Sequence, residues 1–256
     1  MKPFIYNTIN DSSLITEMNL LLDNTDITES PYSYFGSRVP RVTSILKEMI
    51  HSDGLMNWAN YIGRVKHMDH NKFSENSANI GTRVHDAIEK YVSTGYVETF
   101  SDVDNISDKY KMKNAFMSFK EWWDIISTHD IEVLMQEQPL VCKYYGGTLD
   151  MLLKIDGRIF LIDFKTSNHF SYKYHLQTAA YRRSLYTEYG ITVDGILILK
   201  LNKEVVCFEE QVIDLTLIQN IQYINECERF FISLVYSYYN RFYIETRSKD
   251  IFGLRY

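Results

Sequence analysis

The segment from Gly146 to Lys165 constrains the fold of this chain more than any other, because it has the pattern of two strands joined by a tight turn. Two largely apolar runs lie on either side of the dipeptide Asp156-Gly157. Asp-Gly between two such runs is the strongest short-range signal for a two-residue hairpin turn. With these two residues at the turn, the numbers of paired residues add up to 313. The segment therefore predicts an antiparallel hairpin with a defined register.

The predicted register places Asp150 directly opposite Asp163. Directly opposed residues have Cβ atoms ~4.5–5.5 Å apart, and like charges at that distance repel. A divalent cation between the two carboxylates removes the repulsion, and Mg²⁺ prefers oxygen ligands of this kind. The main-chain carbonyl of Phe164 lies close enough to be a further ligand. Side chains alternate along a strand, so Lys165 shares the face of Asp163.

Lys165 has two interpretations. Beside a metal ion, its ammonium group can hold an attacking water or stabilise the extra negative charge of a pentavalent transition state. In a half-buried structural hairpin, it would form a salt bridge with one of the aspartates. The polar turn after the strand, Thr166-Ser167-Asn168, leads into a helix predicted from about Tyr172 to Tyr189. In that helix Gln177 and Tyr181 are four residues apart and share a face, with Arg182 and Arg183 beside them.

The predicted helix 172–189 joins the second strand of the hairpin to an apolar strand at 196–201. A strand, a crossover helix and another strand form a right-handed unit with parallel strands. The hairpin itself is antiparallel, so the sheet is mixed. A further strand is predicted at 204–212 and a long final helix at 215–239. The predicted fold class is α/β, with a mixed central sheet flanked by helices and an N-terminal helical elaboration.

Helices are also predicted at 11–22, from 43 or 44 onward, and at 55–67, 79–92 and 107–128, with a polar loop at 69–76. His85 lies at the edge of the apolar stripe of the helix at 79–92, where a histidine is ordinarily a core residue with satisfied hydrogen bonds. Glu137 lies on a predicted strand at 132–141, where its ordinary role is that of an exposed carboxylate. Taken alone, neither residue points to a metal site.

Composition limits the classes of function. The 256-residue chain has a formal net charge of −6, which disfavours binding of duplex DNA by bulk electrostatics. No apolar run approaches the ~18 residues of a membrane span, so no membrane association is expected. The N-terminus has neither a signal-peptide nor a transit-peptide pattern, which favours a cytoplasmic location. The three cysteines are scattered and form no Cys-x-x-Cys motif, as is typical of reduced thiols.

Five short motifs occur in order along the chain. They are Pro40-Arg41-Val42-Thr43-Ser44-Ile45-Leu46, Gly81-Thr82-Arg83-Val84-His85-Asp86-Ala87-Ile88-Glu89, Gly147-Thr148-Leu149-Asp150, Ile162-Asp163-Phe164-Lys165-Thr166-Ser167 and Leu176-Gln177-Thr178-Ala179-Ala180-Tyr181. At these residues the sequence resembles the PD-(D/E)xK nuclease superfamily, in its RecB-like exonuclease branch. Within that branch it is most similar to the mitochondrial genome maintenance exonuclease and its phage and bacterial relatives. The resemblance extends over about residues 39–240.

The resemblance implies a restriction-endonuclease-like core and a site that binds Mg²⁺ or Mn²⁺. It implies that His85 joins Asp150 and Asp163 as a metal ligand, and that Lys165 is the catalytic lysine. Gln177 and Tyr181 would then orient groups around the scissile phosphate. Glu137 falls on the strand where some relatives carry an additional acidic residue, which makes it a further candidate ligand. An iron–sulfur cluster, present in some relatives, is not expected because it needs four cysteines.

The resemblance also divides the chain into four parts. Residues 1–37 have no assigned fold, 38–130 form a helical arch with the first motif, 131–240 form the nuclease core, and 241–256 form a basic tail. Relatives thread a single DNA strand through such an arch. The candidate DNA-contacting residues here are Thr166, Ser167, Tyr172, Arg182 and Arg183. Aromatic rings of this kind can stack on bases, although core packing is their commoner role.

The leading hypothesis is a metal-dependent deoxyribonuclease that digests DNA from an end or as a single strand, during replication, repair or recombination in a bacterial or phage-infected cell. A structure-selective flap or junction endonuclease with the same site is the first alternative. The second alternative, of another class, is a nuclease-fold protein that binds DNA and cleaves only together with other replication or recombination proteins.

Overall fold

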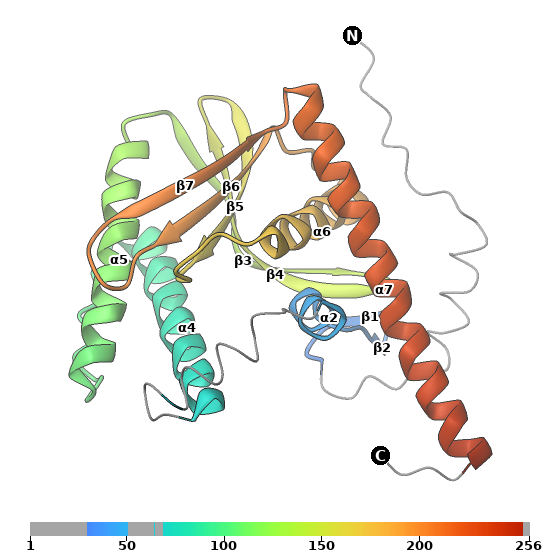
Figure 1. Ribbon diagram of the computed structural model, residues 1–256. Helices are drawn as coiled ribbons and strands as arrows, with labels where there is room; N and C mark the ends of the chain where they lie inside the picture. Colours follow the sequence, from blue (N-terminus) through green and yellow to red (C-terminus); the bar gives the residue numbers. More distant parts are fainter. Residues whose placement is uncertain (1–29, 51–63, 65–68, 253–256) are drawn as a thin grey trace.

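The computed structural model describes residues 30–50, 64 and 69–252. It has a mixed α/β architecture, with a five-stranded sheet in the order β3-β4-β5-β6-β7 and helices on both faces (Figure 1). The elements are β1 (Ser33–Tyr34), β2 (Ser37–Arg38), α2 (Val42–Met49), α4 (His70–Thr94), α5 (Ile106–Ile126), β3 (Ile131–Cys142), β4 (Tyr145–Ile155), β5 (Arg158–Lys165), α6 (Tyr172–Tyr189), β6 (Gly195–Leu201), β7 (Phe208–Asp214) and α7 (Ile218–Phe252). The fold class expected from the sequence is confirmed.

The predicted hairpin is formed by β4 and β5, in the predicted register. Ile155 pairs with Arg158, and Met151 pairs with Ile162. Both turn residues have positive φ angles, 48° at Asp156 and 81° at Gly157, as a type I′ turn requires. The strands β5 and β6 are parallel and joined through α6, while the other neighbouring strands are antiparallel. The sheet is therefore mixed, for the reason that the sequence indicated.

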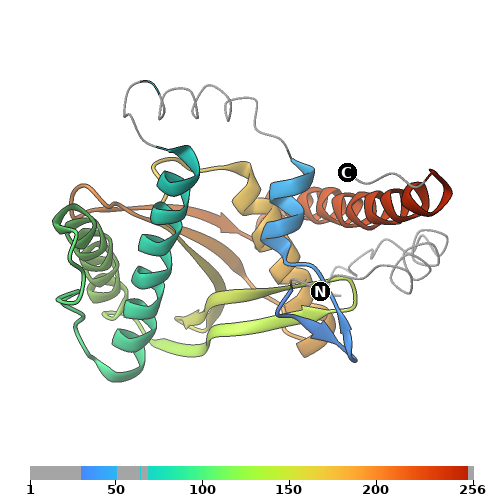
Figure 2. The same ribbon diagram turned by 90° about the horizontal axis from the view of Figure 1, so that it is seen from below.

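A separate apolar cluster covers each face of the sheet. On one face, α4 and α5 bury side chains such as Val84, Phe116 and Phe119 against Met151 and Phe164. On the other face, α2, α6 and α7 pack against Leu152 and Leu161, among others. Figure 2 shows the two helical layers on opposite sides of the strands. Burial of this apolar surface is the main favourable contribution to folding, and it fixes α4 and α5 as a layer of the core.

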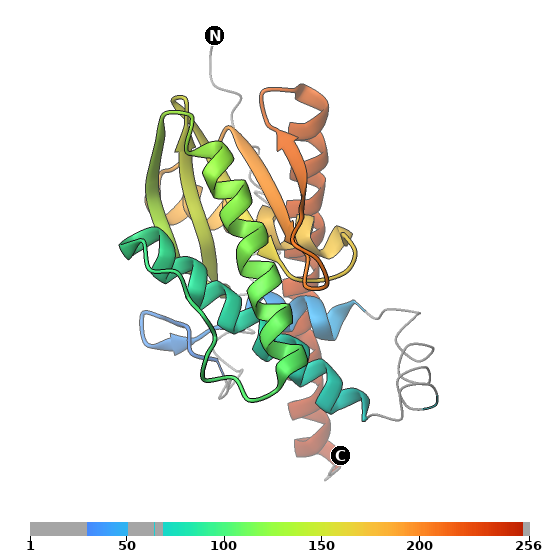
Figure 3. The ribbon, with the colours of Figure 1, turned by 90° about the vertical axis from the view of Figure 1, so that its left-hand side faces the viewer.

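Several predicted boundaries differ from the structure. Helix α4 begins at His70, where a polar loop was predicted, because the carboxylate of Asp69 accepts hydrogen bonds from the N–H groups of Asn71 and Lys72 and caps the helix. Helix α5 packs beside α4 along the sheet (Figure 3), so α4 and α5 do not form a separate arch. Helix α7 continues to Phe252, and residues 241–252 belong to it instead of forming a basic tail.

The helices predicted at 11–22 and 55–67 lie outside the described residues, apart from residue 64. Within the described ranges, no helix has both the length and the apolar character that crossing a membrane requires. Strands β1 and β2 form a small hairpin of their own. The hydrogen bond from the N–H of Val39 to the carbonyl of Tyr32 closes this hairpin (3.1 Å), and the chain then enters α2.

Candidate active site

Asp150 lies where strands β4 and β5 separate. The last pair of the ladder toward the site is Met151 with Ile162, and β5 continues beyond it, paired only with β6, as far as Lys165. At this point the N–H of Phe164 donates a hydrogen bond to Asp150 Oδ2 at 2.7 Å. The Asp150 carboxylate thus accepts the hydrogen bond that a main-chain carbonyl of β4 would accept if the ladder continued. The N–H and C=O of one strand residue point the same way, so the Phe164 carbonyl also faces β4.

His85 and Glu137 approach Asp150 from two other elements. Nδ1 of His85, on α4, is 3.5 Å from Asp150 Oδ1 and 3.5 Å from Glu137 Oε1. The three side chains each offer a ligand atom, and these atoms lie within 4.8 Å of one another. Glu137 is on β3, where the pairs on either side of it are Gln136 with Met151 and Gln138 with Leu149. That register sets Glu137 opposite Asp150.

The backbone of Glu137 is in an unusual conformation. Its φ angle is 44°, in the left-handed region that costs a non-glycine residue about 1–2 kcal/mol. Outliers of this kind cluster at functional sites, where the surrounding structure holds them. Here the result is a half-buried carboxylate beside the imidazole of His85.

The charges of this trio depend on one another. Burial raises the pKa of Glu137, and the nearby Asp150 carboxylate raises it further, against the opposing effect of His85. Burial lowers the pKa of His85, but Asp150 and Glu137 outweigh that effect and raise it to about 10. Burial also acts to raise the pKa of Asp150, yet His85 holds it below the ordinary value. The two carboxylates therefore require a positive charge between them, which the protonated imidazole supplies.

Asp163 and Lys165 form a second pair at the end of β5. The Lys165 ammonium lies 2.7 Å from both carboxylate oxygens of Asp163, donating a hydrogen bond to Oδ1 and forming an ion pair with the buried Oδ2. Asp163 is 1% exposed. Burial raises its pKa to about 6 despite the nearby ammonium. Burial lowers the pKa of Lys165, but Asp163 and Asp150 outweigh this and raise it. Asp163 is not part of the His85, Glu137 and Asp150 trio.

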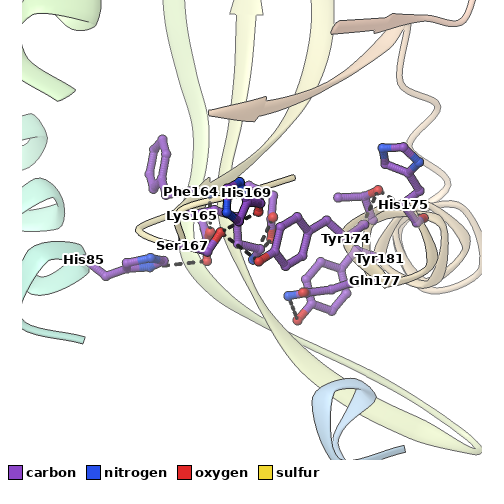
Figure 4. Close-up of polar contacts among 12 residues, drawn as sticks. His85, Phe164, Lys165, Ser167, His169, Tyr174, His175, Gln177 and Tyr181 are labelled. Carbon is purple, nitrogen blue, oxygen red and sulfur yellow. Dashed lines mark hydrogen bonds and ion pairs between the residues drawn. The ribbon is translucent and has the colours of Figure 1, made fainter. Parts of the chain in front are cut away.

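Gln177 and Tyr181 lie together on α6, as their spacing predicted. Gln177 Nε2 donates a hydrogen bond to the Tyr181 hydroxyl at 3.1 Å, and Figure 4 shows the two side chains side by side. The Tyr181 ring packs against the backbone of β4 at Gly147, where an added Cβ would lie 2.4 Å from the ring. Burial raises the pKa of Tyr181 well above its ordinary value, and the aspartates act in the same direction. Tyr181 is therefore a neutral phenol.

All of these side chains except the buried Asp163 line one cavity of about 570 Å³. Thr166 and Ser167 also line it, and Ser167 is held there by a hydrogen bond from the Tyr174 hydroxyl (2.8 Å). Gly81 allows α4 to approach Thr166 closely, because a Cβ on it would lie 3.3 Å from the Thr166 hydroxyl. The lining residues to which sequence reasoning gave no role are Tyr32, Arg41, Thr43, Ala78, Gly81, Thr82, Asp86, Gly147 and Thr148. The first motif contained Arg41 and Thr43, but no pattern pointed to Tyr32.

Three residues expected to contact DNA lie elsewhere. Arg182 is buried and bonded to Asn225 and Glu228 of α7, and Arg183 donates to Glu228 at 2.6 Å. These two arginines hold α6 and α7 together and are not in the cavity lining. Tyr172, at the start of α6, is an exposed ring that also lies outside the cavity lining. The expectation of a phosphate contact at Arg182 and Arg183 does not fit their positions.

Among the comparisons with known proteins, a match was found with solved structures. No family model matches the chain, and no curated protein matches it. Among solved structures, the fold is similar to a phage-related exonuclease from Haemophilus somnus 129PT, with 13% sequence identity and a TM-score of 0.34. That match covers 82% of this chain and 96% of the other.

Proposed function

We propose that this protein is a metal-dependent nuclease that hydrolyses phosphodiester bonds of DNA, preferring single strands or free ends. The observation that carries the proposal is the convergence of two charged groups on one cavity. One is the trio of His85, Glu137 and Asp150, and the other is Lys165, whose ammonium is paired with Asp163, a buried residue outside the lining. The order of the five motifs supports the same assignment.

The residues present suit a divalent cation. The trio offers one imidazole nitrogen and two carboxylates, which together suit Mn²⁺ or, through the oxygens, Mg²⁺. A further carboxylate oxygen, Asp163 Oδ2, is buried, with the Lys165 ammonium 2.7 Å away. His85, Glu137 and Asp150 would hold the ion, with Asp163 and the Phe164 carbonyl as additional oxygens. Such an ion lowers the pKa of a bound water and offsets charge on a phosphoryl oxygen.

The protein groups around that position have distinct roles in the proposed reaction. Lys165, held in place by Asp163, orients the attacking water and offsets the charge that develops on the phosphorus oxygens. The Tyr181 hydroxyl accepts a hydrogen bond from Gln177 and keeps its own proton. It therefore has a hydrogen bond to donate to a phosphate oxygen, with Gln177 as the residue that positions it. Thr166 and Ser167 add neutral hydroxyl groups at the cavity wall.

One feature of the fold favours a second candidate, a flap or junction endonuclease that uses the same site. In the described part of the chain, α4 and α5 pack on the sheet and do not form an arch through which a strand would be threaded. A site reached without threading between α4 and α5 does not require a free DNA end. The chemistry would be the same in both cases, and the candidates differ only in the substrate that reaches the cavity.

The test is digestion of an end-labelled single-stranded oligonucleotide in Mg²⁺, in Mn²⁺ and in EDTA, with a closed circular single strand as the companion substrate. We expect metal-dependent loss of the linear strand, abolished by Asp163→Asn, and an intact circle. Cleavage of the circle would favour the endonuclease. Binding of the oligonucleotide without cleavage of either substrate would overturn the enzymatic assignment and leave a protein that cleaves only within a complex.

A further inference from the structure

Arg41 occupies the cavity wall on the side of α2 and β1, whereas the trio is supplied by α4, β3 and β4. Its backbone is fixed beside β4 by a bridge to Gly146 and by a hydrogen bond from the Gly146 N–H to the Pro40 carbonyl at 2.9 Å. Gly146 precedes Asp150 by four residues on the same strand. At the rise of a β-strand, this separates the two positions by about 13 Å.

The guanidinium of Arg41 differs from the other basic side chains near the cavity. Arg41 is exposed, and within the described ranges it forms no ion pair or side-chain hydrogen bond. Lys165, the other basic residue of the lining apart from His85, is held by Asp163. By contrast, Arg182 and Arg183 are held by Glu228. Arg41 thus presents a positive charge to the cavity that no described carboxylate neutralises.

We propose that Arg41 binds a second phosphate of the nucleic-acid strand, neighbouring the one that is cleaved, with the exposed hydroxyl of Thr43 beside it. This inference rests on the proposed function and narrows the substrate class to a strand with at least two phosphates. An arginine fork matches the geometry of a phosphate and forms short, charge-assisted hydrogen bonds with it. The backbone of Arg41 lies beside Gly146, about 13 Å along β4 from Asp150, and its long side chain extends from there to the phosphate next to the scissile one.

The experiment is a titration of the full chain with a fluorescein-labelled oligothymidylate in Ca²⁺, followed by anisotropy at several salt concentrations. For Arg41→Ala we expect Kd to rise about tenfold, as the loss of a charged hydrogen bond predicts. The slope of log affinity against log salt should fall by about 0.7, the value for one lost phosphate contact on a single strand. Arg41→Lys should keep the slope and recover only part of the affinity. Lys47→Ala, on α2 but outside the cavity lining, should match the wild type in both.

The inference fails if Arg41→Ala matches the wild type in affinity and salt slope, or if the wild-type protein does not bind the oligonucleotide. Hydrolysis in Mg²⁺ and Mn²⁺, measured on the same preparations, separates this result from the proposed function. Cleavage together with an unchanged Arg41→Ala titration overturns the role of Arg41 alone. Loss of affinity and slope in Arg41→Ala without any cleavage by the wild type overturns the nuclease and leaves the phosphate contact.

Discussion

Two clusters of charged side chains in the described part of the molecule differ in the sign of the charge that is in excess. Between α6 and α7, Glu228 accepts hydrogen bonds from Arg183 at 2.6 Å and from Arg182 at 3.5 Å, and Arg182 also bonds to Asn225 at 3.2 Å. At the candidate active site, the carboxylates of Glu137, Asp150 and Asp163 face one lysine and one histidine.

The difference distinguishes a structural cluster from a functional one. Charges taken out of water must be paired and hydrogen-bonded, or they are costly. In the α6–α7 cluster one carboxylate faces two guanidinium groups, so the anion is matched by residues of the protein and its effect is to hold two helices together. The acidic groups of the candidate active site meet this requirement only in part, with a strained backbone at Glu137 and raised pKa values at Glu137 and Asp163. A cation from solution is what this second cluster can still accept.

The largest expected effect is on catalysis, from Lys165→Met, which keeps the aliphatic part of the side chain and removes its charge. We expect the rate of hydrolysis to fall by roughly 10²–10³-fold, since the group that stabilises developing charge is lost. The measurement is single-turnover digestion of an end-labelled strand. Lys154→Met, on β4 in an exposed ion pair with Glu132 of β3, is the control and should keep the wild-type rate. A Lys165→Met enzyme with full activity would contradict the assignment.

At the α6–α7 cluster we expect a substitution to lower stability and leave the rate of hydrolysis unchanged. Glu228→Gln leaves buried Arg182 and half-buried Arg183 without their anion, and we expect the free energy of unfolding to drop by about 3 kcal/mol. Chemical denaturation measures this loss, and digestion assays below the unfolding transition should show the wild-type rate. Glu226→Gln, exposed on the same helix, should change neither quantity. If Glu228→Gln removed activity without loss of stability, the cluster would not be purely structural.

Metal binding should stabilise the folded protein at the cluster that contains Asp150 and not at the one that contains Glu228. At a metal concentration of ~100 times Kd, Mn²⁺ should add about 2.7 kcal/mol to the free energy of unfolding. Asp150→Asn should remove this gain while keeping an oxygen to accept the hydrogen bond of the Phe164 N–H. Glu228→Gln should retain the gain, although it starts from a lower stability. Thermal unfolding with Mn²⁺ and with EDTA makes the comparison, and an equal gain in Asp150→Asn would argue for a different ion site.

The smallest effect concerns two glycines that lie under aromatic rings. An added Cβ would lie 2.4 Å from the Tyr181 ring at Gly147 and 2.4 Å from the Phe160 ring at Gly195. Both Gly147→Ala and Gly195→Ala should lower the free energy of unfolding by about 1–3 kcal/mol through overpacking. Only Gly147→Ala should also reduce the rate of hydrolysis, because it displaces Tyr181. Equal rates in the two variants would mean that the position of Tyr181 is not critical.

The sequence predicted those parts of the site that depend on local geometry. The Asp-Gly turn fixes the register of β4 and β5, so the approach of Asp150 to the end of β5 could be read directly. The spacing of Gln177 and Tyr181 likewise put them on one face of α6. By the same rule, residues one and two positions further along the helix cannot share that face, which explains why Arg182 and Arg183 turn toward α7 instead.

The remaining features depend on contacts between distant segments. Glu137 reaches Asp150 through the register of β3 on β4, which includes a shift between Val133 and Met135 that no local pattern reveals. Similarly, Arg41 joins the cavity through a bridge to Gly146, more than a hundred residues away. The start of α4 at His70 had a readable signal in the capping aspartate, but the polar composition of 69–76 was interpreted as a loop.

The hydrogen bond from the Phe164 N–H to Asp150 links a main-chain amide signal to the state of the site. Its donor belongs to the middle strand, and the ring of the same residue packs 5.4 Å from Phe119 and 5.8 Å from His85, centroid to centroid. A change in the electron density of the Asp150 carboxylate must alter the environment of this one amide proton. In a nuclear magnetic resonance spectrum of isotope-labelled protein, the Phe164 amide is therefore a reporter of ion occupancy that needs no substrate.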